Sequence, residues 1–235
     1  MNNGLYEKPI FRIVGDRGIM AEYGNTIDPL INRRVRAVAI AMRGAMPAGV
    51  TELIPTYCSL IIIYDPCVTN PPTLKDVLLS IEEHLSETDI PPPETAEIPV
   101  CYGGDLGPDI EFVAQAHDLT VEDVIRIHSD PLYPIYMIGF TPGFPYLGGL
   151  AEQLHTPRLP TPRTFVPAGS VGIANAQTGI YSIDSPGGWQ LIGRTPMKLF
   201  DPERSEPFLL RAGDLLKFKP VSRDEYLSVS EDGEK

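Results

Sequence analysis

The sequence predicts an α+β domain followed by an all-β domain. Two amphipathic helical segments alternate with short strands before the proline triplet Pro91–Pro93, and helical periodicity ends after Pro131. From there, short apolar runs alternate with Gly/Pro turns, which is typical of a compact β-structure. A chain of 235 residues with 43% hydrophobic content can hold two modest cores. We place the domains at 1–93 and 94–220, followed by an acidic tail at 221–235.

Strands and helices alternate in the first domain. Asp28 caps a helix that runs to about Ala45, and Thr73 caps a second helix at roughly Leu74–Leu85. The fifth strand contains Pro99, which predicts that this strand lies at a sheet edge. The expected strands are Pro9–Val14, Gly18–Tyr23, Val50–Pro55, Cys58–Tyr64 and Glu97–Tyr102. This order predicts a small sheet with two helices on one face, a ferredoxin-like α+β layer.

Two short helices, about Asp109–His117 and Val121–His128, open the second domain. Thr120 caps the second helix, with Asp123 at the third helical position in a variant of the capping box. The short apolar runs beyond them suit a compact barrel or sandwich. These runs are Phe165–Val166, Val171–Ala174, Ile180–Ile183, Gln190–Ile192, Met197–Phe200 and Leu215–Phe218. The tail Val221–Lys235 has two positive and five negative side chains, and we expect it to fray.

The composition excludes several classes of partner. A formal net charge of −12 argues against nucleic acid and anionic lipid, because both need clustered Lys and Arg. No apolar run approaches the ~18 residues of a membrane span. The N-terminus lacks a signal-peptide pattern, so we expect a cytoplasmic protein. The three cysteines, Cys58, Cys67 and Cys101, lack zinc-ligand spacing and are expected to be reduced thiols, so we assign no metal ligand.

The segment Ile138–Leu150, IGFTPGFPYLGGL, holds four glycines and two prolines and carries no charge. A linker would be polar, and each proline would remove a ladder hydrogen bond from a core strand. We interpret the segment as a shaped, buried turn in which glycines let the backbone come close to a ligand. Pro160–Asn175 and Ser185–Pro196 have a similar composition, so three loops within about sixty residues predict one constructed site.

Charge is unevenly distributed along the chain. The span Pro131–Phe200 holds four basic side chains (Arg158, Arg163, Arg194 and Lys198) against two acidic ones, Glu152 and Asp184. The balance there is +2, so the rest of the chain carries −14. A positive, glycine-rich and apolar region in an acidic protein predicts an anion-binding pocket.

Two catalytic motifs are absent. A pair of glycines has the spacing of a P-loop, but Gly149 and Leu150 stand where Lys and Ser/Thr are needed. Ala168 replaces the first glycine of a nucleophile elbow around Ser170, and no strand-to-helix pattern follows. The four histidines are scattered, which argues against catalytic zinc.

Arg158, Arg163 and Arg194 are the first candidates for catalytic work, because a guanidinium fork suits a carboxylate or a phosphate. The alternative is that they serve solubility or structural ion pairs. His128 ends a predicted helix, where the imidazolium is favoured, and is a candidate proton donor. The alternative is an ordinary histidine at a helix C-terminus.

Tyr146 is a further catalytic candidate that, together with Trp189, forms the wall of a pocket. The candidate substrate-binding residues are Gly143, Phe144, Gln177, Ser185 and Gly188. For Phe144 a place in the core is the competing interpretation. Asp105 and Asp109 either orient a cation or cap the following helix, and we favour the cap.

Five ordered strings carry a resemblance to a known family: CYGGDLGPDIEFVA, GFTPGFPYLGGL, TPRTFVPAGSVGIA, QTGIYSIDSPGGWQLIGRTP and RAGDLLKF. They resemble the family of the 5-oxoprolinase B subunit, which is also called allophanate hydrolase subunit 1 or KipI. This family is related to the carboxyltransferase part of urea amidolyase. One departure is Asn175, which stands where a glycine is expected and would slightly narrow the pocket mouth. The resemblance implies an N-terminal α+β domain and a C-terminal cyclophilin-like β-barrel.

The resemblance also implies partners and a reaction. The chain would form a heteromer with the C subunit of 5-oxoprolinase, and the A subunit would complete the ATP-dependent opening of 5-oxoproline to glutamate. ATP and Mg²⁺ would be shared with the partner. The arginines would hold the substrate carboxylate or the phosphates, the glycine-loop amides would line a developing oxyanion, and His128 or Tyr146 would supply a proton. The competing hypothesis is a KipI-type inhibitor that binds a sporulation sensor histidine kinase.

Overall fold

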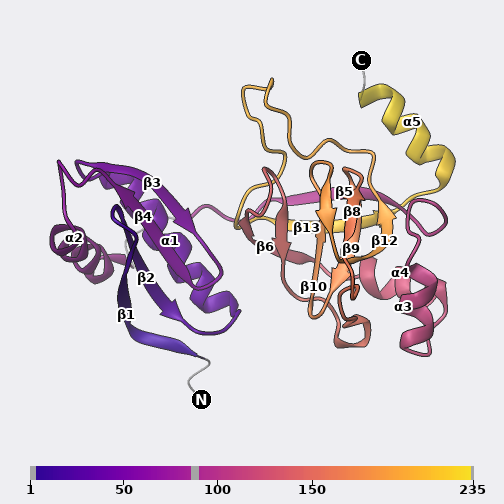
Figure 1. Ribbon diagram of the computed structural model, residues 1–235, viewed down its shortest axis with the longest axis horizontal. Helices are drawn as coiled ribbons and strands as arrows, with labels where there is room; N and C mark the ends of the chain where they lie inside the picture. Colours follow the sequence, from indigo (N-terminus) through magenta and orange to yellow (C-terminus); the bar gives the residue numbers. More distant parts are fainter. Residues whose placement is uncertain (1–3, 86–89, 234–235) are drawn as a thin grey trace. The chain divides into compact units, whose positions relative to one another are not determined.

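The computed structural model describes residues 4–85 and 90–233 (Figure 1). The chain divides into two compact units, Met1–Pro92 and Pro93–Lys235. Within the described residues, no helix is both long enough and apolar enough to cross a lipid bilayer.

The first unit is a four-stranded antiparallel sheet with two helices. Its strands are β1 (Leu5–Val14), β2 (Gly18–Gly24), β3 (Val50–Pro55) and β4 (Ser59–Tyr64), in the spatial order β1-β2-β4-β3. The helices are α1 (Pro29–Ala45) and α2 (Pro71–Glu83). The sheet consists of two hairpins, β1-β2 and β3-β4, joined by the pair β2-β4, and the fifth predicted strand belongs to the second unit. The ferredoxin-like description is therefore not confirmed.

The helix starts follow from short polar side chains placed before prolines. Asp28 accepts a hydrogen bond from the backbone N–H of Leu30 at 2.8 Å, which confirms the predicted cap of α1. The cap of α2 is Asn70 rather than Thr73, whose N–H donates to Asn70 Oδ1 at 3.1 Å. The helix begins earlier than predicted because proline is favoured in the first helical turn, where its missing N–H would be unpaired anyway.

An ion pair holds the two helices of this unit together. Arg34 on α1 pairs with Glu82 on α2 at 2.6 Å and donates to the carbonyl of Tyr6 in β1 at 2.8 Å. Its guanidinium also lies over the ring of Tyr23, 5.3 Å from the centroid. Both charged side chains are largely buried. One guanidinium therefore joins both helices to the sheet.

The second unit is built on a closed barrel, which decides between the predicted barrel and sandwich. The order around the barrel is β10-β7-β6-β13-β5-β12-β9, and β5 pairs in parallel with β13. The barrel strands are β5 (Thr95–Tyr102), β6 (Tyr133–Ile138), β7 (Pro145–Leu147), β9 (Ser170–Ala174), β10 (Gln177–Ile180), β12 (Gln190–Arg194) and β13 (Leu215–Pro220). A separate two-stranded sheet joins β8 (Arg163–Val166) to β11 (Ser185–Gly187).

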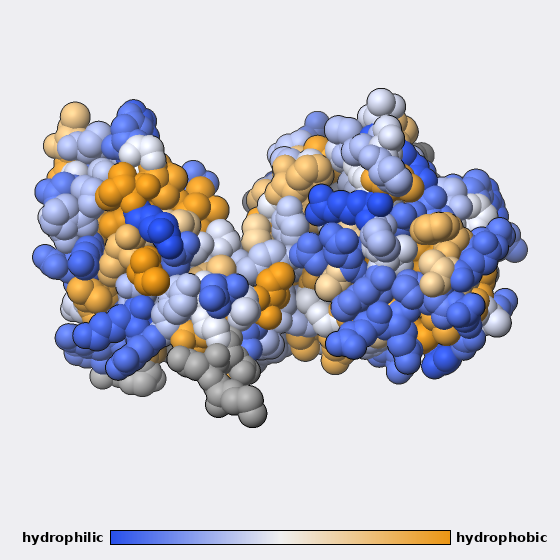
Figure 2. Space-filling model, turned by 60° about the horizontal axis from the view of Figure 1, so that its bottom comes forward, coloured by the Kyte–Doolittle hydropathy of each residue, from blue (hydrophilic) through white to orange (hydrophobic). Residues whose placement is uncertain are grey.

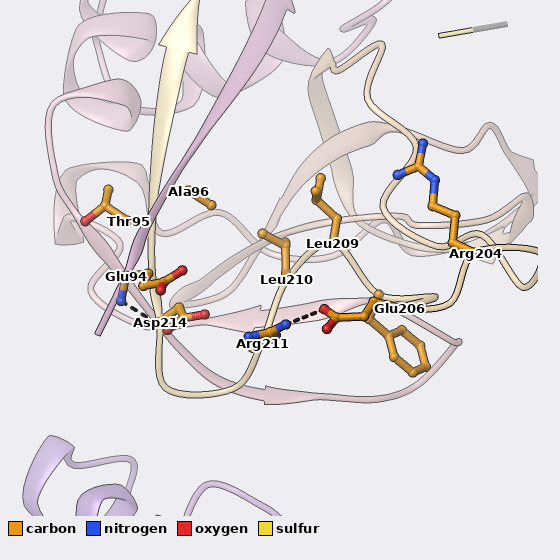
Figure 3. A pocket seen from close by; sticks show the side chains of 10 residues that line it. Glu94, Thr95, Ala96, Arg204, Glu206, Leu209, Leu210, Arg211 and Asp214 are labelled. Atoms are coloured by element: carbon orange, nitrogen blue, oxygen red, sulfur yellow. Dashed lines mark hydrogen bonds and ion pairs between the residues drawn. The ribbon is translucent and has the colours of Figure 1, made fainter. Parts of the chain in front are cut away.

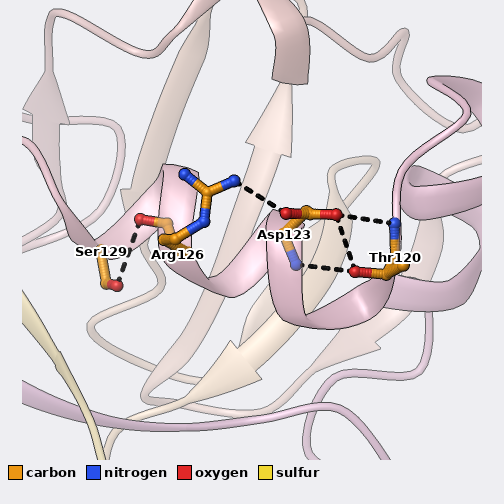
Figure 4. A network of polar contacts seen from close by, with 4 residues as sticks. All are labelled: Thr120, Asp123, Arg126 and Ser129. Carbon is orange, nitrogen blue, oxygen red and sulfur yellow. Dashed lines mark hydrogen bonds and ion pairs between the residues drawn. The ribbon is translucent and has the colours of Figure 1, made fainter.

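Helices α3 (Ile110–Ala116) and α4 (Val121–Ser129) pack on this barrel, and a short 3-10 turn, η2, spans Glu152–Leu154. The predicted capping box is confirmed: Thr120 Oγ1 accepts from the N–H of Asp123 at 3.1 Å, and the Asp123 carboxylate accepts from the backbone N–H and hydroxyl of Thr120 (Figure 4). Asp123 also pairs with Arg126 at 2.7 Å. The start of α4 is therefore held by side chains of its own first turn.

The tail prediction was wrong over the described residues. Residues Arg223–Gly233 form helix α5, because the Ser222 hydroxyl oxygen accepts from the N–H of Glu225 at 3.3 Å and the Glu225 carboxylate accepts from the N–H of Ser222, a capping box. Arg223 then pairs with Asp105. Asp105 is thus an ion-pair partner, neither a cap nor a cation ligand. The last two residues of the predicted tail lie outside the described residues.

The two units differ in surface character. In Figure 2 a group of orange residues gathers on the visible face of the first unit, whereas blue residues predominate on that of the second. By sequence, residues 93–235 carry 11 basic and 20 acidic side chains, a balance of −9. The first 92 residues carry 8 basic and 11 acidic side chains, a balance of −3.

Thr120→Ala should lower the free energy of unfolding by about 1 kcal/mol, because the N–H of Asp123 at the start of α4 loses its acceptor. Thr120→Ser keeps the hydroxyl and is the matched control. Urea unfolding followed by fluorescence of Trp189, the chain's single tryptophan, reports on this unit directly. Equal losses in the two variants would show that the methyl group, not the cap, matters.

Candidate functional site

The structure brings the three predicted Gly/Pro loops into contact. The ring of Phe144 in the first loop lies 5.5 Å from that of Trp189 in the third, and Arg163 in the second loop donates to the carbonyl of Trp189 at 3.2 Å. The segment just before the second loop also contacts the third: Leu159 donates its N–H to Gly188 at 2.8 Å, and Gln190 donates to the carbonyl of Pro157 at 2.9 Å. The prediction that these loops build one region is thereby supported by direct contacts.

An aromatic cluster fills the space where the loops meet. The ring of Phe144 lies 5.1 Å from Tyr146, 5.5 Å from Tyr181 and 5.5 Å from Trp189, centroid to centroid. The contacts with Tyr181 and Trp189 are edge-to-face, the favourable arrangement for aromatic rings. Phe144 is only 2% exposed, so it supports the site from beneath and does not offer its face to a substrate. The prediction that Phe144 contacts substrate is corrected to a core role.

Glycine is needed at one position of this region for steric reasons. Gly143 has φ of 82°, in the left-handed region, and a Cβ there would come within 2.9 Å of the Cβ of Phe200. The neighbouring turn is closed by Gly139 N–H donating to Phe144 O at 3.0 Å. It leaves Phe140 64% exposed at a φ of 64°. The first loop is therefore a shaped turn with one aromatic ring standing outside the core.

Arg158 lies exposed beside the aromatic cluster and makes no ion pair with any described residue. Its backbone is held on both sides by the hydrogen bonds of Pro157 and Leu159. Burial raises the pKa of Tyr146, and the positive charge of Arg158 opposes that shift. Burial likewise raises the pKa of Tyr181, again with opposition from Arg158. The positive charge of Arg158 therefore acts on two protonated phenols, those of Tyr146 and Tyr181.

Arg163 is a structural clamp in this conformation. Its Nη2 donates to both carboxylate oxygens of Asp109, at 2.7 and 2.9 Å, and its Nη1 donates to the carbonyl of Trp189 at 3.2 Å. Asp109 also accepts from the N–H of Leu191 at 2.6 Å. The predicted cap was wrong, because the Asp109 side chain makes no capping bond to α3. The carboxylate instead joins α3, β8 and β12.

The other cations of the predicted anion pocket are also engaged. Arg194 donates from Nε to the carbonyl of Ala168 at 2.8 Å, and Lys198 pairs with Asp201 at 3.1 Å. The charge balance of +2 was counted over Pro131–Phe200. It omitted Asp109 and Asp201, the partners of Arg163 and Lys198, because both lie outside that span in sequence. Among the described residues of this region, Arg158 and Arg194 thus make no ion pair, and of the two only Arg158 is exposed.

His128 is part of the barrel interior and not of an exposed site. It is 0% exposed, and its Nδ1 and Nε2 each make a 2.8 Å contact, with the hydroxyls of Tyr102 and Thr178 respectively. The Thr178 hydroxyl donates to Gly172 O at 3.0 Å, so it must accept from Nε2–H, and Nδ1 then accepts from Tyr102. Burial lowers the pKa of His128 to about 3. The predicted imidazolium was wrong, because desolvation outweighs the position at a helix C-terminus.

The remaining predicted residues lie in the loops and strands around this region. Gln177 is half-buried at the start of β10, and Gly188 accepts the loop bond from Leu159. Ser185 is buried, and its hydroxyl has no hydrogen-bond partner among the described residues. Asn175 adopts φ of 52°, a conformation that Asn tolerates better than other side chains, which accounts for its replacing the expected glycine.

Sequence reasoning missed Tyr181 and the role of Asp109. Tyr181 is 2% exposed inside the string TGIYSID, where nothing marked it apart from other core aromatics.

The described residues contain no group of three or more His, Cys, Asp or Glu side chains able to hold a metal ion.

This chain is similar in sequence to one family of known proteins. Residues 9–210 match the family described as "Carboxyltransferase domain, subdomain C and D". A protein of Bacillus subtilis (strain 168), named as the B subunit of 5-oxoprolinase, is 43% identical over 230 residues, covering 93% of this chain and 95% of the relative. The protein of the same name from Escherichia coli O157:H7 is 42% identical over 211 residues, covering 88% and 94%.

Solved structures share the fold. The crystal structure of TTHA0988 superposes with a TM-score of 0.80 at 39% identity, covering 88% of this chain. This chain spans only 40% of that protein's length. The urea carboxylase of Kluyveromyces lactis gives a TM-score of 0.77 at 23% identity, with 96% of this chain and 23% of the enzyme covered, and shows the fold alone.

Arg163→Ala should lower the free energy of unfolding by about 2 kcal/mol, because the half-buried Asp109 carboxylate loses two charge-assisted hydrogen bonds. Arg158→Ala removes an exposed cation with no ion pair and is the matched control, expected to stay within about 0.5 kcal/mol of the parent chain. Urea unfolding followed by Trp189 fluorescence measures both. Equal stability of the two variants would contradict the clamp.

Acidification should destabilise the barrel through His128. Its pKa is about 3 in the folded chain and 6.5 ordinarily, so only the unfolded state binds the proton in between. Stability is then complete above pH 6.5 and falls as the pH decreases, by about 1 kcal/mol between pH 7 and 5.5. His128→Gln should be less stable at pH 7 but lack this component of the pH dependence. An unchanged pH dependence in urea unfolding of the variant would refute the assignment.

Proposed function

The chain belongs to the family of carboxyltransferase domains, subdomain C and D, and on that premise we propose that it is the B subunit of an ATP-dependent 5-oxoprolinase. The observation that carries the proposal is identity above 40% to two proteins of that name, each matched over nearly its whole length. The enzyme would open 5-oxoproline to glutamate together with the A and C subunits. This chain would contribute one part of the assembled site.

Arg158 is the residue we propose to hold the substrate. 5-Oxoproline carries one carboxylate on a five-membered lactam ring, so it needs one cation and an adjoining flat, apolar surface. Arg158 offers the cation, and the half-buried ring of Tyr146 lies near it. A guanidinium binds a carboxylate through two parallel hydrogen bonds, which fixes orientation as well as affinity. Gly143 and Gly188 shape the loops around this position.

Tyr146 is the proposed hydrogen-bond donor to the lactam. Burial raises the pKa of its hydroxyl, so the phenol stays protonated at neutral pH and can donate to an oxygen on which charge develops. The buried Ser185 hydroxyl, which lacks a partner among the described residues, is a second neutral group proposed for substrate. His128 is removed from this set, and Arg163 and Arg194 instead hold the backbone at Trp189 and Ala168.

The nucleotide chemistry belongs to the assembled enzyme. Ring opening breaks the lactam C–N bond, places the oxygen of water on the carbonyl carbon and a proton on the nitrogen. ATP and Mg²⁺ would activate the lactam for this step. Because the sequence has no P-loop, we assign those contacts to the partner proteins and derive no step of this chain through them. The alternative, a KipI-type inhibitor of a histidine kinase, has no observation in its favour here.

The proposal is tested by mixing the purified chain with the A and C subunits and following 5-oxoproline-dependent ATP hydrolysis. Arg158→Gln should lower kcat/KM roughly 10- to 100-fold, mainly through KM, because the carboxylate loses a charge-assisted partner in both ground and transition states. Lys198→Gln, which removes another exposed cation of the same unit, is the control and should retain activity. No 5-oxoproline-dependent turnover in the complete mixture would sink the proposed function.

A further inference from the structure

The strand β5 is paired along its whole length on one side but only at one end on the other. Its partner β13 pairs with every residue from Thr95 to Val100. On the opposite side β12 pairs only with Cys101 and Tyr102. The first half of β5 therefore has one edge without a neighbouring strand among the described residues.

The hydrogen bonds show which backbone groups lie at that edge. Leu215 donates to the carbonyl of Glu94, and Val221 donates to that of Val100, so even-numbered residues of β5 face β13. Gly103 donates to Ile192, so odd-numbered residues face the other side. In a strand the N–H and C=O of one residue point the same way. The N–H and C=O groups of Thr95 and Glu97 therefore point to the unpaired edge.

Two prolines explain why the pairing stops. The antiparallel register joins Cys101 to Arg194, and the same register carried two residues further would place Pro99 opposite Pro196. That position requires both residues to donate an N–H, and proline has none. The ladder between β12 and β5 accordingly ends at Arg194, while on the opposite side of β12 Thr195 still donates to Gly169 at 2.9 Å. The unpaired edge is thus built into the sequence.

A pocket of about 360 Å³ lies beside the same half of β5. One side is formed by Glu94, Thr95 and Ala96, and the other by residues 204–211 of the long connection between β12 and β13 (Figure 3). Phe208 and Leu209 are 42% and 39% exposed there. Strand edge and apolar side chains together provide the two components of peptide recognition by strand addition, which are main-chain hydrogen bonds and side-chain pockets.

The charges around the pocket indicate which kind of side chain an occupant would carry. Its lining carries three carboxylates (Glu94, Glu206 and Asp214) against two arginines. Both arginines are already paired, Arg211 with Glu206 and Arg204 with Asp201. Glu94, together with Glu97 on the edge itself, makes no ion pair with any described residue. The unit as a whole carries −9. Basic side chains complement this surface.

We propose that an extended, Lys/Arg-bearing segment of a partner protein in the enzyme complex adds as a strand to the edge Thr95–Pro99. The segment would hydrogen-bond to the N–H and C=O groups of Thr95 and Glu97 and place its cations near Glu94 and Glu97. Phe208 and Leu209 would contact its apolar side chains. This inference rests on the proposed function in naming the enzyme complex as the source of the segment, while the edge itself is a property of this chain.

Amide hydrogen exchange read by NMR tests the edge residue by residue. In the isolated chain, the amides of Thr95 and Glu97 should exchange fast, while those of Ala96, Ile98 and Val100, which face β13, should be protected. In the complex with the A and C subunits, the Thr95 and Glu97 amides should slow by roughly tenfold or more. Amides that are already protected in the isolated chain would overturn the inference.

Two variants of Glu97 distinguish the contribution of its backbone N–H from that of its carboxylate. Glu97→Pro removes the edge N–H on the side away from β13, and Glu97→Ala removes only the carboxylate, with thermal unfolding confirming that both fold. The proline variant should lose partner affinity at least about tenfold beyond the alanine variant, since a main-chain bond is lost. Equal affinity of the two variants would count against strand addition.

The outcomes distinguish this inference from the proposed function. A complex that assembles and hydrolyses ATP without protecting Thr95 and Glu97 overturns the inference and leaves the function standing. If no complex forms, the proposed function fails, and a blocked seven-residue peptide of alternating lysine and valine decides the inference. Protection by that peptide, but not by its twin with glutamate in place of lysine, supports the edge site. Protection by neither peptide overturns it.

Discussion

One carboxylate, that of Asp109, holds together the elements around which the candidate site is built. It accepts two hydrogen bonds from Arg163 on β8 and one from the backbone of Leu191 on β12, while its own residue precedes α3. Arg163 also donates a hydrogen bond to the carbonyl of Trp189, whose ring belongs to the aromatic cluster. Because hydrogen bonds to charged groups are strong when partly buried, this pair holds α3, β8 and β12 together beside the aromatic cluster.

A second polar chain, inside the barrel, shows why residue type alone misassigns a site. Tyr102, His128, Thr178 and Gly172 form one directed sequence of hydrogen bonds in an interior that excludes water. Every donor in that sequence has an acceptor, so the polar groups are satisfied only while His128 is neutral. The barrel thus uses its histidine to define a core, and the aromatic cluster near Arg158 takes no part in that chain of hydrogen bonds.

Prolines determine where the barrel is incomplete. Pro99 and Pro196 occupy one pairing position of β5 and β12, and their missing N–H groups end the ladder there. The prediction that Pro99 places its strand at a sheet edge was wrong, because β5 lies between β13 and β12 in the closed barrel. Only the pairing with β12 stops short of Pro99. Proline prevents a strand from pairing with a neighbour. Here it leaves the backbone N–H and C=O groups of Thr95 and Glu97 without a strand partner, beside a pocket.

The sequence by itself determined the local features of this protein: the cap at Asp28, the capping box at Thr120, two amphipathic helices and three Gly/Pro loops of shared character. These depend on residues close together in the chain, whose preferences act over a few positions. Only the tertiary structure decided which charges remain free, because Arg163 and Lys198 find their carboxylates outside the stretch counted for charge. It likewise decided that His128 is neutral, since desolvation depends on what packs around a side chain and not on its neighbours in sequence.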